Sequence, residues 1–481
     1  MTLLIFSAYL LVTVGVGLWA ARVGRDSQED FFLAGRDVSA FAMALSAVSS
    51  GRSAWLVLGA SGAAWSMGLS ALWLFPGYIA AEALMFVSVG PRLRQRSLET
   101  GALTVSEVLE RAPLGPAGPG SSRLPVRPLA GLVIVLFLLT YVSAQLVAGG
   151  KTLGTLFPEI DGRTVGLLIT AGIVLVYTWL GGYRAVVITD VVQACLMLAG
   201  IVLLPLLGLL HVGGFGALVD ALREIDPTLL ALSSGTVALL GGFCIGLGSL
   251  GNPHILVRHM SLREPAGAKA ALFYGTFWNV VMAAGALLLG LVGRAIYPEL
   301  EDLGAGGRET LFPVLATDMC AEFLFAGFVG VLLATLFAAI MSTCDSQLLV
   351  IAASLLRDLR PGTSDSEQGG GRLLSRLAVL GTLAVAVGLT FGENPLVHNL
   401  VLLSWFALGI GLGPAMLLLL YDDRTTARGV FAGILTGVLG VVAAWWFLAR
   451  PEGRNVSWEA GPVFVAALLA TFSLRAGRQS P

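Results

Sequence analysis

Long apolar runs, separated by short polar segments, follow one another along almost the whole 481-residue chain. A run of about 20 apolar residues can cross a bilayer as a helix, and only 12% of the residues are charged, about half of the ~25% usual in a soluble domain. The sequence therefore predicts an all-α, multi-pass membrane protein and excludes a soluble enzyme, a disordered regulator and a basic nucleic-acid binder. Thirteen membrane-spanning helices are predicted, at residues 2–20, 38–65, 68–89, 129–150, 164–180, 185–211, 233–257, 268–293, 322–356, 374–391, 396–420, 428–449 and 459–474.

The basic residues predict the orientation of the chain in the membrane. No basic segment precedes the first run, and Arg22 and Arg25 follow it, so we interpret it as a retained helix rather than a signal peptide. The connections on one side, among which we place Arg258, hold about three times as many Lys and Arg residues as those on the other. Because basic residues favour the cytoplasmic side, we expect the N-terminus outside and the C-terminus inside. The scarcity of Lys is typical of a GC-rich bacterial genome, so we expect the plasma (inner) membrane of a bacterium.

Two predicted helices contain backbone-breaking residues near their middles. Residues 49–53 interrupt the second span and residues 246–253 interrupt the seventh. These spans begin two blocks of five helices, and paired interrupted helices in corresponding positions are typical of inverted-repeat transporters. Alternatively, the Gly and Ser residues there only let helices pack closely. We expect one transmembrane domain over residues 1–481, comprising repeats at about 38–211 and 233–420 and extra helices at 2–20, 428–449 and 459–474.

The longest inner connection, residues 97–128, carries a helix start signal. Thr104 followed three residues later by Glu107 predicts a capping box that begins a short surface helix. The stretch at residues 113–128 is rich in Pro, Gly and Ser and is predicted to be a loop.

Several short motifs occur in order along nearly the whole chain. They are Asp30–Arg36 (DFFLAGR), Ala44–Ala47 (ALSA), Trp55–Gly59 (WLVLG), Gly181–Gln193 (GGYRAVVITDVVQ), Gly251–Arg258 (GNPHILVR), Met341–Thr343 with Gln347–Leu349, and Gly413–Pro414. In this order the motifs resemble the sodium:solute symporter family and, within it, the sodium/proline symporter branch. The resemblance implies a five-plus-five inverted-repeat (LeuT-type) fold, with one extra helix before the repeats and two after them. It also implies Na⁺-driven uptake of a solute by alternating access.

The resemblance also implies a Na⁺ site between the second and ninth spans. Its ligands would be the backbone carbonyls of Ser49, Arg52 and Ala339 and the hydroxyls of Ser342 and Thr343. Residues 339, 342 and 343 lie on one helix face, since positions three and four apart are neighbours. Alternatively, the two hydroxyls only bond to carbonyls of their own helix.

A second Na⁺ site is implied at Asp190, which some relatives use together with polar side chains of the ninth span. Here Ser342, Asp345 and Ser346 would face Asp190. Alternatively, Asp190 is an N-cap at the membrane edge, beside Thr189.

Three positions near these sites depart from the proline branch. An Asp and a Met of that branch correspond to Gly51 and Arg52, and a small neutral residue corresponds to Asp345. A charge at the centre of a membrane costs at least ~2.5–3.5 kcal/mol and marks function by default. Arg52 could clamp a solute carboxylate, could pair with Glu82 or Asp345, or could replace a Na⁺ charge. Counted from an outer turn at about Met67, Arg52 and Glu82 both lie ~22 Å deep, which permits an ion pair.

The solute pocket is expected between the two helix breaks and the fourth span. Candidate lining residues are Arg52, Ser53, Trp55, Tyr141, Gln145, Phe243, Ser249, Asn252 and Trp405. Alternatively, the aromatic residues among them only pack against lipid or the core. Ile245 and Ser249 stand where the proline branch has an aromatic pair, so the pocket shape is expected to differ.

The sequence therefore predicts a secondary transporter that imports a small organic solute, such as proline or a related carboxylate, with Na⁺ as the coupling ion. A proton-coupled carrier, an uncoupled carrier and a non-transporting solute sensor are the alternatives. An enzyme is not expected, since the chain has no H-E-x-x-H motif. The expected partners are the solute, Na⁺ and the lipid bilayer, with no obligatory protein partner.

Overall fold

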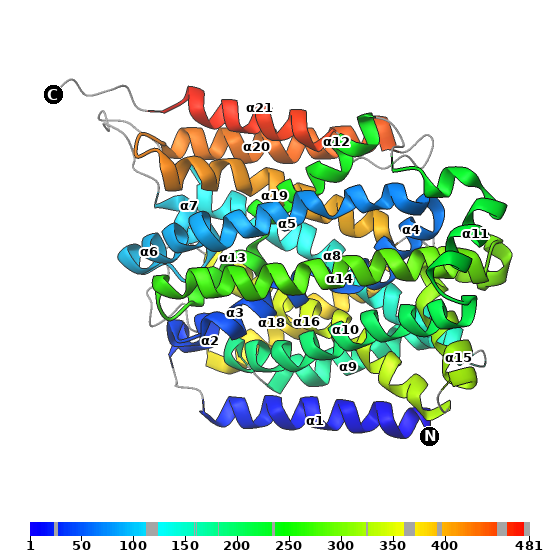
Figure 1. Cartoon of the computed structure of the whole chain (residues 1–481). Coiled ribbons are helices and arrows are strands. Elements are labelled where there is room, and N and C mark those ends of the chain that lie inside the picture. The colour runs from blue at the N-terminus through cyan, green and yellow to red at the C-terminus, as the bar shows by residue number, and fades with distance from the viewer. Residues whose placement is uncertain are drawn as a thin grey trace, which may run out of the picture.

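The structure is a computed structural model that describes residues 1–23, 27–111, 124–157, 159, 161–180, 182–232, 236–323, 326–359, 371–391, 397–449 and 459–475. Within these ranges the chain is almost entirely helical, and the β-type pairing found there is one isolated bridge between Val38 and Leu262. Figure 1 shows long helices running side by side in one common direction, with α1 at one edge and α20 and α21 at the opposite edge. The all-α prediction is therefore confirmed.

Among the described residues, eight segments are long and apolar enough to cross a membrane, and a bent helix pair would make nine. Six of the eight begin with the helices α1 (Thr2–Val23), α8 (Val126–Leu156), α10 (Tyr183–Val212), α16 (Val329–Ala353), α19 (Val397–Tyr421) and α20 (Ala427–Ala444). Of the other two segments, one contains α14 (Ala268–Ile296) and one extends over Ala40–Thr100. Three shorter apolar helices are α9 (Leu167–Leu180), α18 (Gly371–Gly388) and α21 (Ala460–Ser473). Residues 233–235, at the start of the predicted seventh span, and residue 396, at the start of the predicted eleventh span, lie outside the described residues.

The Ala40–Thr100 segment folds back on itself at Gly68. It comprises α3 (Ala40–Ala54), η2 (Trp55–Ala60), α4 (Ser61–Met67), η3 (Gly68–Leu74), α5 (Pro76–Leu84), η4 (Met85–Val89) and α6 (Gly90–Thr100). Gly68 has φ +62°, and a Cβ there would overlap the backbone of Leu229. Helical structure continues to Thr100, beyond the predicted end at residue 89, since the arginine-rich turns after the apolar run stay helical until Gly101 in the left-handed region caps them.

Both predicted helix breaks are present. In the second span, Ser53 at the end of α3 has φ +49° and ψ −171°, which is non-helical backbone. In the seventh span, α12 (Thr236–Cys244) and η7 (Ile245–Leu250) are bent by 53° from α13 (Pro253–Ser261). The second break also serves close packing, because a Cβ at Gly248 would overlap the Trp405 indole of α19.

The start of the first broken span and the end of the second are joined directly. The Val38 amide donates to the Ser261 carbonyl (3.1 Å), and the Arg263 amide donates to the Val38 carbonyl (2.9 Å). These bonds connect the residues before α3 to the residues after α13. They hold the start of one broken span against the end of the other.

The predicted capping box is confirmed. The Glu107 amide donates to the Thr104 hydroxyl (3.1 Å), and the Glu107 carboxylate accepts from the Leu103 amide (2.8 Å) at the start of α7 (Val105–Glu110). However, α7 is largely buried rather than a surface helix. Residues 112–123 of the predicted loop lie outside the described residues.

The helices outside the two predicted repeats cover the bundle on opposite edges. α1 packs against α10 and α16, whereas α20 packs against α19 and α21. The first residue of α1 and the last residue of α21 lie at opposite ends of the bundle (Figure 1).

We expect the turn at Gly68 to be sensitive to any side chain. Gly68→Ala should lower the free energy of unfolding by about 1–3 kcal/mol, because the new Cβ meets the Leu229 backbone at a left-handed φ. Thermal unfolding of the purified protein in detergent measures the effect. The control is Gly172→Ala in α9, where a Cβ would meet nothing within 4 Å; equal melting temperatures for both variants would contradict the assigned geometry.

Candidate functional site

The break at Ser53 exposes backbone groups that other helices satisfy. The Ala54 amide donates to Gln145 Oε1 of α8 (3.0 Å), and the Ser50 carbonyl accepts from Thr343 Oγ1 of α16 (3.2 Å). Tyr141 of α8 donates its hydroxyl to Ser53 Oγ (3.2 Å). The break is therefore a junction of α3, α8 and α16 and not a local irregularity.

Arg52, one residue before the break, is held by a closed polar group. Its Nη2 forms an ion pair with Glu82 of α5, and its Nε donates to Asn279 Oδ1 of α14 (3.0 Å). Asn279 in turn donates to the other Glu82 oxygen (2.6 Å), and the guanidinium lies 3.7 Å from the centroid of the Tyr78 ring. The Arg52 side chain is only 1% exposed. The polar contacts of Arg52 are thus to Glu82 and Asn279, and not to Asp345.

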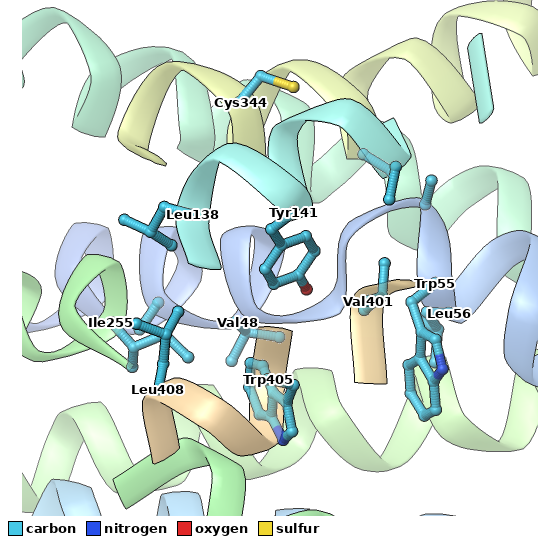
Figure 2. Close-up of a cluster of buried hydrophobic side chains, with 14 of the residues drawn as sticks. Val48, Trp55, Leu56, Leu138, Tyr141, Ile255, Cys344, Val401, Trp405 and Leu408 are labelled. Carbon is cyan, nitrogen blue, oxygen red and sulfur yellow. The ribbon is translucent and has the colours of Figure 1, made fainter. Parts of the chain in front are cut away.

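A small cavity lies between the break, α8, η7 and α19. Figure 2 shows the Tyr141 ring pointing toward Trp405, with Val401 and Trp55 beside them. Four of the predicted pocket residues line this cavity, namely Arg52, Trp55, Tyr141 and Trp405. The remaining lining residues are Gly51, Ile245, Val401 and Leu402.

Three other predicted pocket residues lie close to this lining. Ser53 and Gln145 bond at the break, and Asn252 donates to the carbonyls of Gly248 (2.6 Å) and Trp405 (3.1 Å). One buried polar atom of Gln145 and one of Asn252 have no protein hydrogen-bond partner.

Ser249 and Phe243 do not line the cavity. Ser249 is buried in η7, and its hydroxyl has no protein partner. The prediction that Phe243 lines the pocket is wrong, because its side chain is 48% exposed on α12 and is not part of the cavity lining.

A series of contacts closes one side of the cavity at the beginning of α19. Trp55 Nε1 donates to His398 Nδ1 (3.0 Å). The buried Glu309 carboxylate accepts from the His398 amide (2.9 Å) and the Val397 amide (3.2 Å), and it pairs with Lys151 of α8 (2.7 Å). This arrangement caps α19 with a carboxylate and connects Trp55 to α8.

The proposed first Na⁺ ligands meet where α3 crosses α16. Thr343 Oγ1 donates to the Ala339 carbonyl (3.1 Å) as well as to Ser50, and Ser342 Oγ donates to the Ala339 carbonyl (3.3 Å). Both hydroxyls therefore bond to a carbonyl of their own helix, as the alternative interpretation expects, and Thr343 also bonds to α3. The α3 carbonyl in contact is that of Ser50, which lies between the expected Ser49 and Arg52.

The proposed second Na⁺ ligands surround a side chain that the sequence analysis placed elsewhere. Arg258 Nη2 donates to Asp190 Oδ2 (2.9 Å) and to Ser346 Oγ (2.5 Å). Asp345 Oδ1 accepts from the Ser346 amide (2.6 Å) and hydroxyl (3.1 Å). Arg258 was counted with the inner connections, but it is 1% exposed and lies within α13, because helical residues continue to Ser261. The N-cap interpretation of Asp190 is wrong, since α10 begins at Tyr183.

Sequence reasoning missed Asn279, Tyr78 and His398 as neighbours of the site. An isolated Asn within the apolar run of α14 is a signal that could have found Asn279, because buried amides need partners. Tyr78 and His398 carry no such signal in the sequence. They become recognisable only when Arg52 and Trp55 are placed next to them.

Comparisons with known proteins agree with this geometry. A model of the sodium:solute symporter family matches residues 31–437. The high-affinity proline transporter PutP of Bacillus subtilis is 35% identical over 462 residues, which cover 94% of this chain and 93% of that protein. A sodium/proline symporter of Staphylococcus aureus is 31% identical over 488 residues, covering 98% of this chain and 91% of that protein.

Solved structures show the same fold. A Na⁺-coupled sialic acid symporter in a substrate-bound outward-open state superposes with a TM-score of 0.77 at 19% identity, covering 100% of this chain and 99% of that one. The transporter MhsT in complex with L-phenylalanine superposes with a TM-score of 0.51 at 13% identity, covering 93% of this chain and 99% of that one. The predicted LeuT-type class of fold is therefore confirmed.

The fold and the buried polar site define a multi-pass secondary transporter of the plasma membrane of a bacterium. The chain belongs to the sodium:solute symporter family. It is a symporter rather than an enzyme, and it imports a small organic solute with Na⁺ as the coupling ion.

We expect the pair between Arg52 and Glu82 to be essential for folding but replaceable as a unit. Glu82→Gln or Arg52→Gln should each lower the free energy of unfolding by about 3–5 kcal/mol, because each leaves a buried charge unpaired. The double variant Arg52→Gln/Glu82→Gln should lose much less than the sum of the two single losses. Detergent-solubilised unfolding in a double-mutant cycle measures the coupling, and additive losses would show that the two side chains are independent.

Proposed function

We propose that this protein imports proline, or a small carboxylated solute similar to proline, together with Na⁺. The observation that carries the proposal is the position of the aromatic cavity. It lies at the α3 break, directly beside the contact between the Ser50 carbonyl and Thr343 of α16. The names of the relatives in Bacillus subtilis and Staphylococcus aureus support proline as the first solute to test.

The cavity suits a small solute with an apolar ring or chain. Trp55, Tyr141 and Trp405 supply flat apolar surfaces, and Ile245, Val401 and Leu402 supply the remaining apolar wall. The groups available for a solute carboxylate or amine are the polar ones beside the cavity at the two breaks, on Ser53, Gln145 and Asn252. Arg52 is assigned a structural role here, because Glu82 and Asn279 already occupy its guanidinium.

The proposed Na⁺ ligands are the Ala339 carbonyl, the Ser342 and Thr343 hydroxyls, and the α3 carbonyls of residues 49–52. Neutral oxygens of this kind suit a hard monovalent cation. Na⁺ bound between α3 and α16 would stabilise the geometry of the break that forms one wall of the solute cavity. Coupling then follows, since the ion and the solute favour the same conformation of α3.

We propose thirteen membrane spans with the N-terminus outside. The turn at Gly68 divides the Ala40–Thr100 segment into two spans, and the bent seventh span and the three shorter apolar helices complete the number. The placement of the first residue of α1 and the last residue of α21 at opposite ends of the bundle supports an odd number (Figure 1). The repeats would be at about 38–211 and 233–420, with α1, α20 and α21 outside them.

A second small cavity supports an inner route for the solute. It is lined by residues of α7, α8, α13 and α16, among them Val105, Ile134, Val257 and Ala353. It reaches Pro253, the first residue of α13. We propose that the solute leaves by this route when the inner halves of the broken spans move apart. No bond of the solute would be made or broken in this cycle.

Solute counterflow in proteoliposomes tests the proposed transport and its solute. Purified protein should exchange labelled proline, and an inward Na⁺ gradient should accumulate it above equilibrium. Replacement of Na⁺ by choline should abolish accumulation. Exchange without accumulation would favour the uncoupled carrier, accumulation driven by a pH gradient would favour the proton-coupled carrier, and binding without exchange would favour the sensor.

We expect loss of either α16 hydroxyl to weaken Na⁺ binding. Ser342→Ala and Thr343→Ala should each raise the Na⁺ concentration needed for half-maximal uptake by at least about tenfold, because one hard oxygen ligand is lost. The matched control is Thr140→Ala, whose hydroxyl donates to the Leu136 carbonyl of its own helix (3.2 Å). If all three variants have the same Na⁺ dependence, α16 does not hold the ion.

The proposed orientation predicts which loops a membrane-impermeant thiol reagent can reach. A cysteine at Asp220 in α11 (Phe215–Ile225) should react from outside intact cells, and a cysteine at Arg263 should react only after the cells are opened. Both native side chains are exposed, so substitution there should leave the fold intact. The unsubstituted protein reports the background from native cysteines, and the opposite pattern would reverse the topology.

A further inference from the structure

The guanidinium of Arg258 lies in the place proposed for a second Na⁺. Its Nε donates to Ser46 Oγ (2.7 Å), and its Nη2 contacts Asp190, Ser346 and Ser50. These side chains come from α3, α10 and α16, so the guanidinium has oxygen partners from three helices besides its own. A guanidinium is a permanent monovalent cation, and here it supplies these oxygens with the positive charge that a bound Na⁺ would supply.

The charges around Arg258 do not balance. Asp190 and Asp345 are fully buried acids, and Arg258 is the buried base that contacts this group of residues. Asp345 Oδ1 has the amide and hydroxyl of Ser346 as partners, whereas its Oδ2 is buried with no protein hydrogen-bond partner. One oxygen of Asp190 is also without a partner. With both carboxylates ionised, the group carries one uncompensated negative charge in a region where an unpaired charge is costly.

The missing positive charge can be supplied by the Na⁺ at the proposed first site. Asp345 follows Ser342, a proposed ligand of the first site, by three residues on α16, and residues with this spacing are neighbours on a helix surface. Ser50 of α3 also contacts α16 here. Its hydroxyl donates to the Ser342 carbonyl (2.5 Å), and its carbonyl accepts from Thr343. Arg52 does not contribute to this balance, because Glu82 neutralises it.

We propose that Arg258 is a tethered cation that fills the second Na⁺ site, and that Asp345 is the counter-charge for a single Na⁺ at the first site. One Na⁺ then makes the buried group neutral, and a second would leave it with a net positive charge in a medium of low dielectric constant. The protein accordingly takes up one Na⁺ with each solute molecule. This inference rests on the proposed Na⁺ coupling and adds its stoichiometry and the residues that set it.

The stoichiometry is measured with purified protein in proteoliposomes. The membrane potential at which Na⁺-coupled proline flux reverses should correspond to one Na⁺ per proline, and the Hill coefficient for Na⁺ should be about 1. Na⁺ binding without solute is measured separately, as the rise of the melting temperature with Na⁺ concentration. A reversal potential that corresponds to two Na⁺ would overturn the inference.

Asp345→Asn tests the counter-charge. It should weaken Na⁺ binding by at least about tenfold in the melting experiment, and should leave the melting temperature without Na⁺ unchanged or higher, because a buried uncompensated charge is removed. A purely structural role would lower the Na⁺-free melting temperature instead. Asp220→Asn, on an exposed acid, is the matched control. Unchanged Na⁺ affinity in Asp345→Asn would overturn the inference.

Arg258→Gln tests the tethered cation. The released Asp190 should accept a second Na⁺, so the Hill coefficient should rise toward about 2. The double variant Arg258→Gln/Asp190→Asn, which removes one positive and one negative charge, should again bind one Na⁺. It tests the inference even if Arg258→Gln alone does not fold. A folded Arg258→Gln that still binds one Na⁺, or a double variant that binds two, would overturn the inference. Absence of Na⁺-driven uptake of any solute would instead refute the proposed function, since the melting experiments report on Na⁺ alone.

Discussion

Charges in the interior of this membrane protein must be neutralised by other helices, and this constraint shapes its centre. Arg52 of α3 is paired with Glu82 of α5 and bonded to Asn279 of α14. Arg258 of α13 is paired with Asp190 of α10 and bonded to serines of α3 and α16. Because each guanidinium needs its partners at hydrogen-bond distance, the two arginines fix how five transmembrane segments approach the first broken span, α3.

The helix breaks impose the same requirement on the backbone, whose polar groups must also find partners on other helices. A break frees amides and carbonyls that cannot remain unsatisfied away from water. At Ser53 they are satisfied by Gln145 and Thr343, and beyond the second break Asn252 bonds to the carbonyls of Gly248 and Trp405. Gln145 and Asn252 lie next to the lining of the solute cavity, and Thr343 belongs to the proposed Na⁺ site. The unwound backbone, the cavity and the proposed ion site are therefore adjacent and share contacts, so we expect a change in one to affect the others.

Patterns that act locally or at a defined depth were predictable from the sequence. The capping box at Thr104 and Glu107 follows from spacing alone. Arg52 and Glu82 lie at equal depth on either side of a turn, and they form an ion pair in the structure. Arg258 was misplaced because α13 stays helical beyond the apolar run, and Phe243 was misplaced because its side chain is exposed instead of facing the cavity. The first error concerns the end of a helix and the second the direction of a side chain, and neither hydropathy nor spacing specifies these.

The sequence by itself determined the class of fold, the number and position of the apolar runs, the two breaks and the residues available for an ion and a solute. Hydrophobic length and backbone-breaking residues are properties of the chain that need no neighbours to be recognised. Only the tertiary structure decided which charge meets which. Glu82 rather than Asp345 neutralises Arg52, and Arg258 contacts Asp190. The physical reason is that a buried charge takes its partner from whichever helix packs against it, and that packing is a property of the whole bundle.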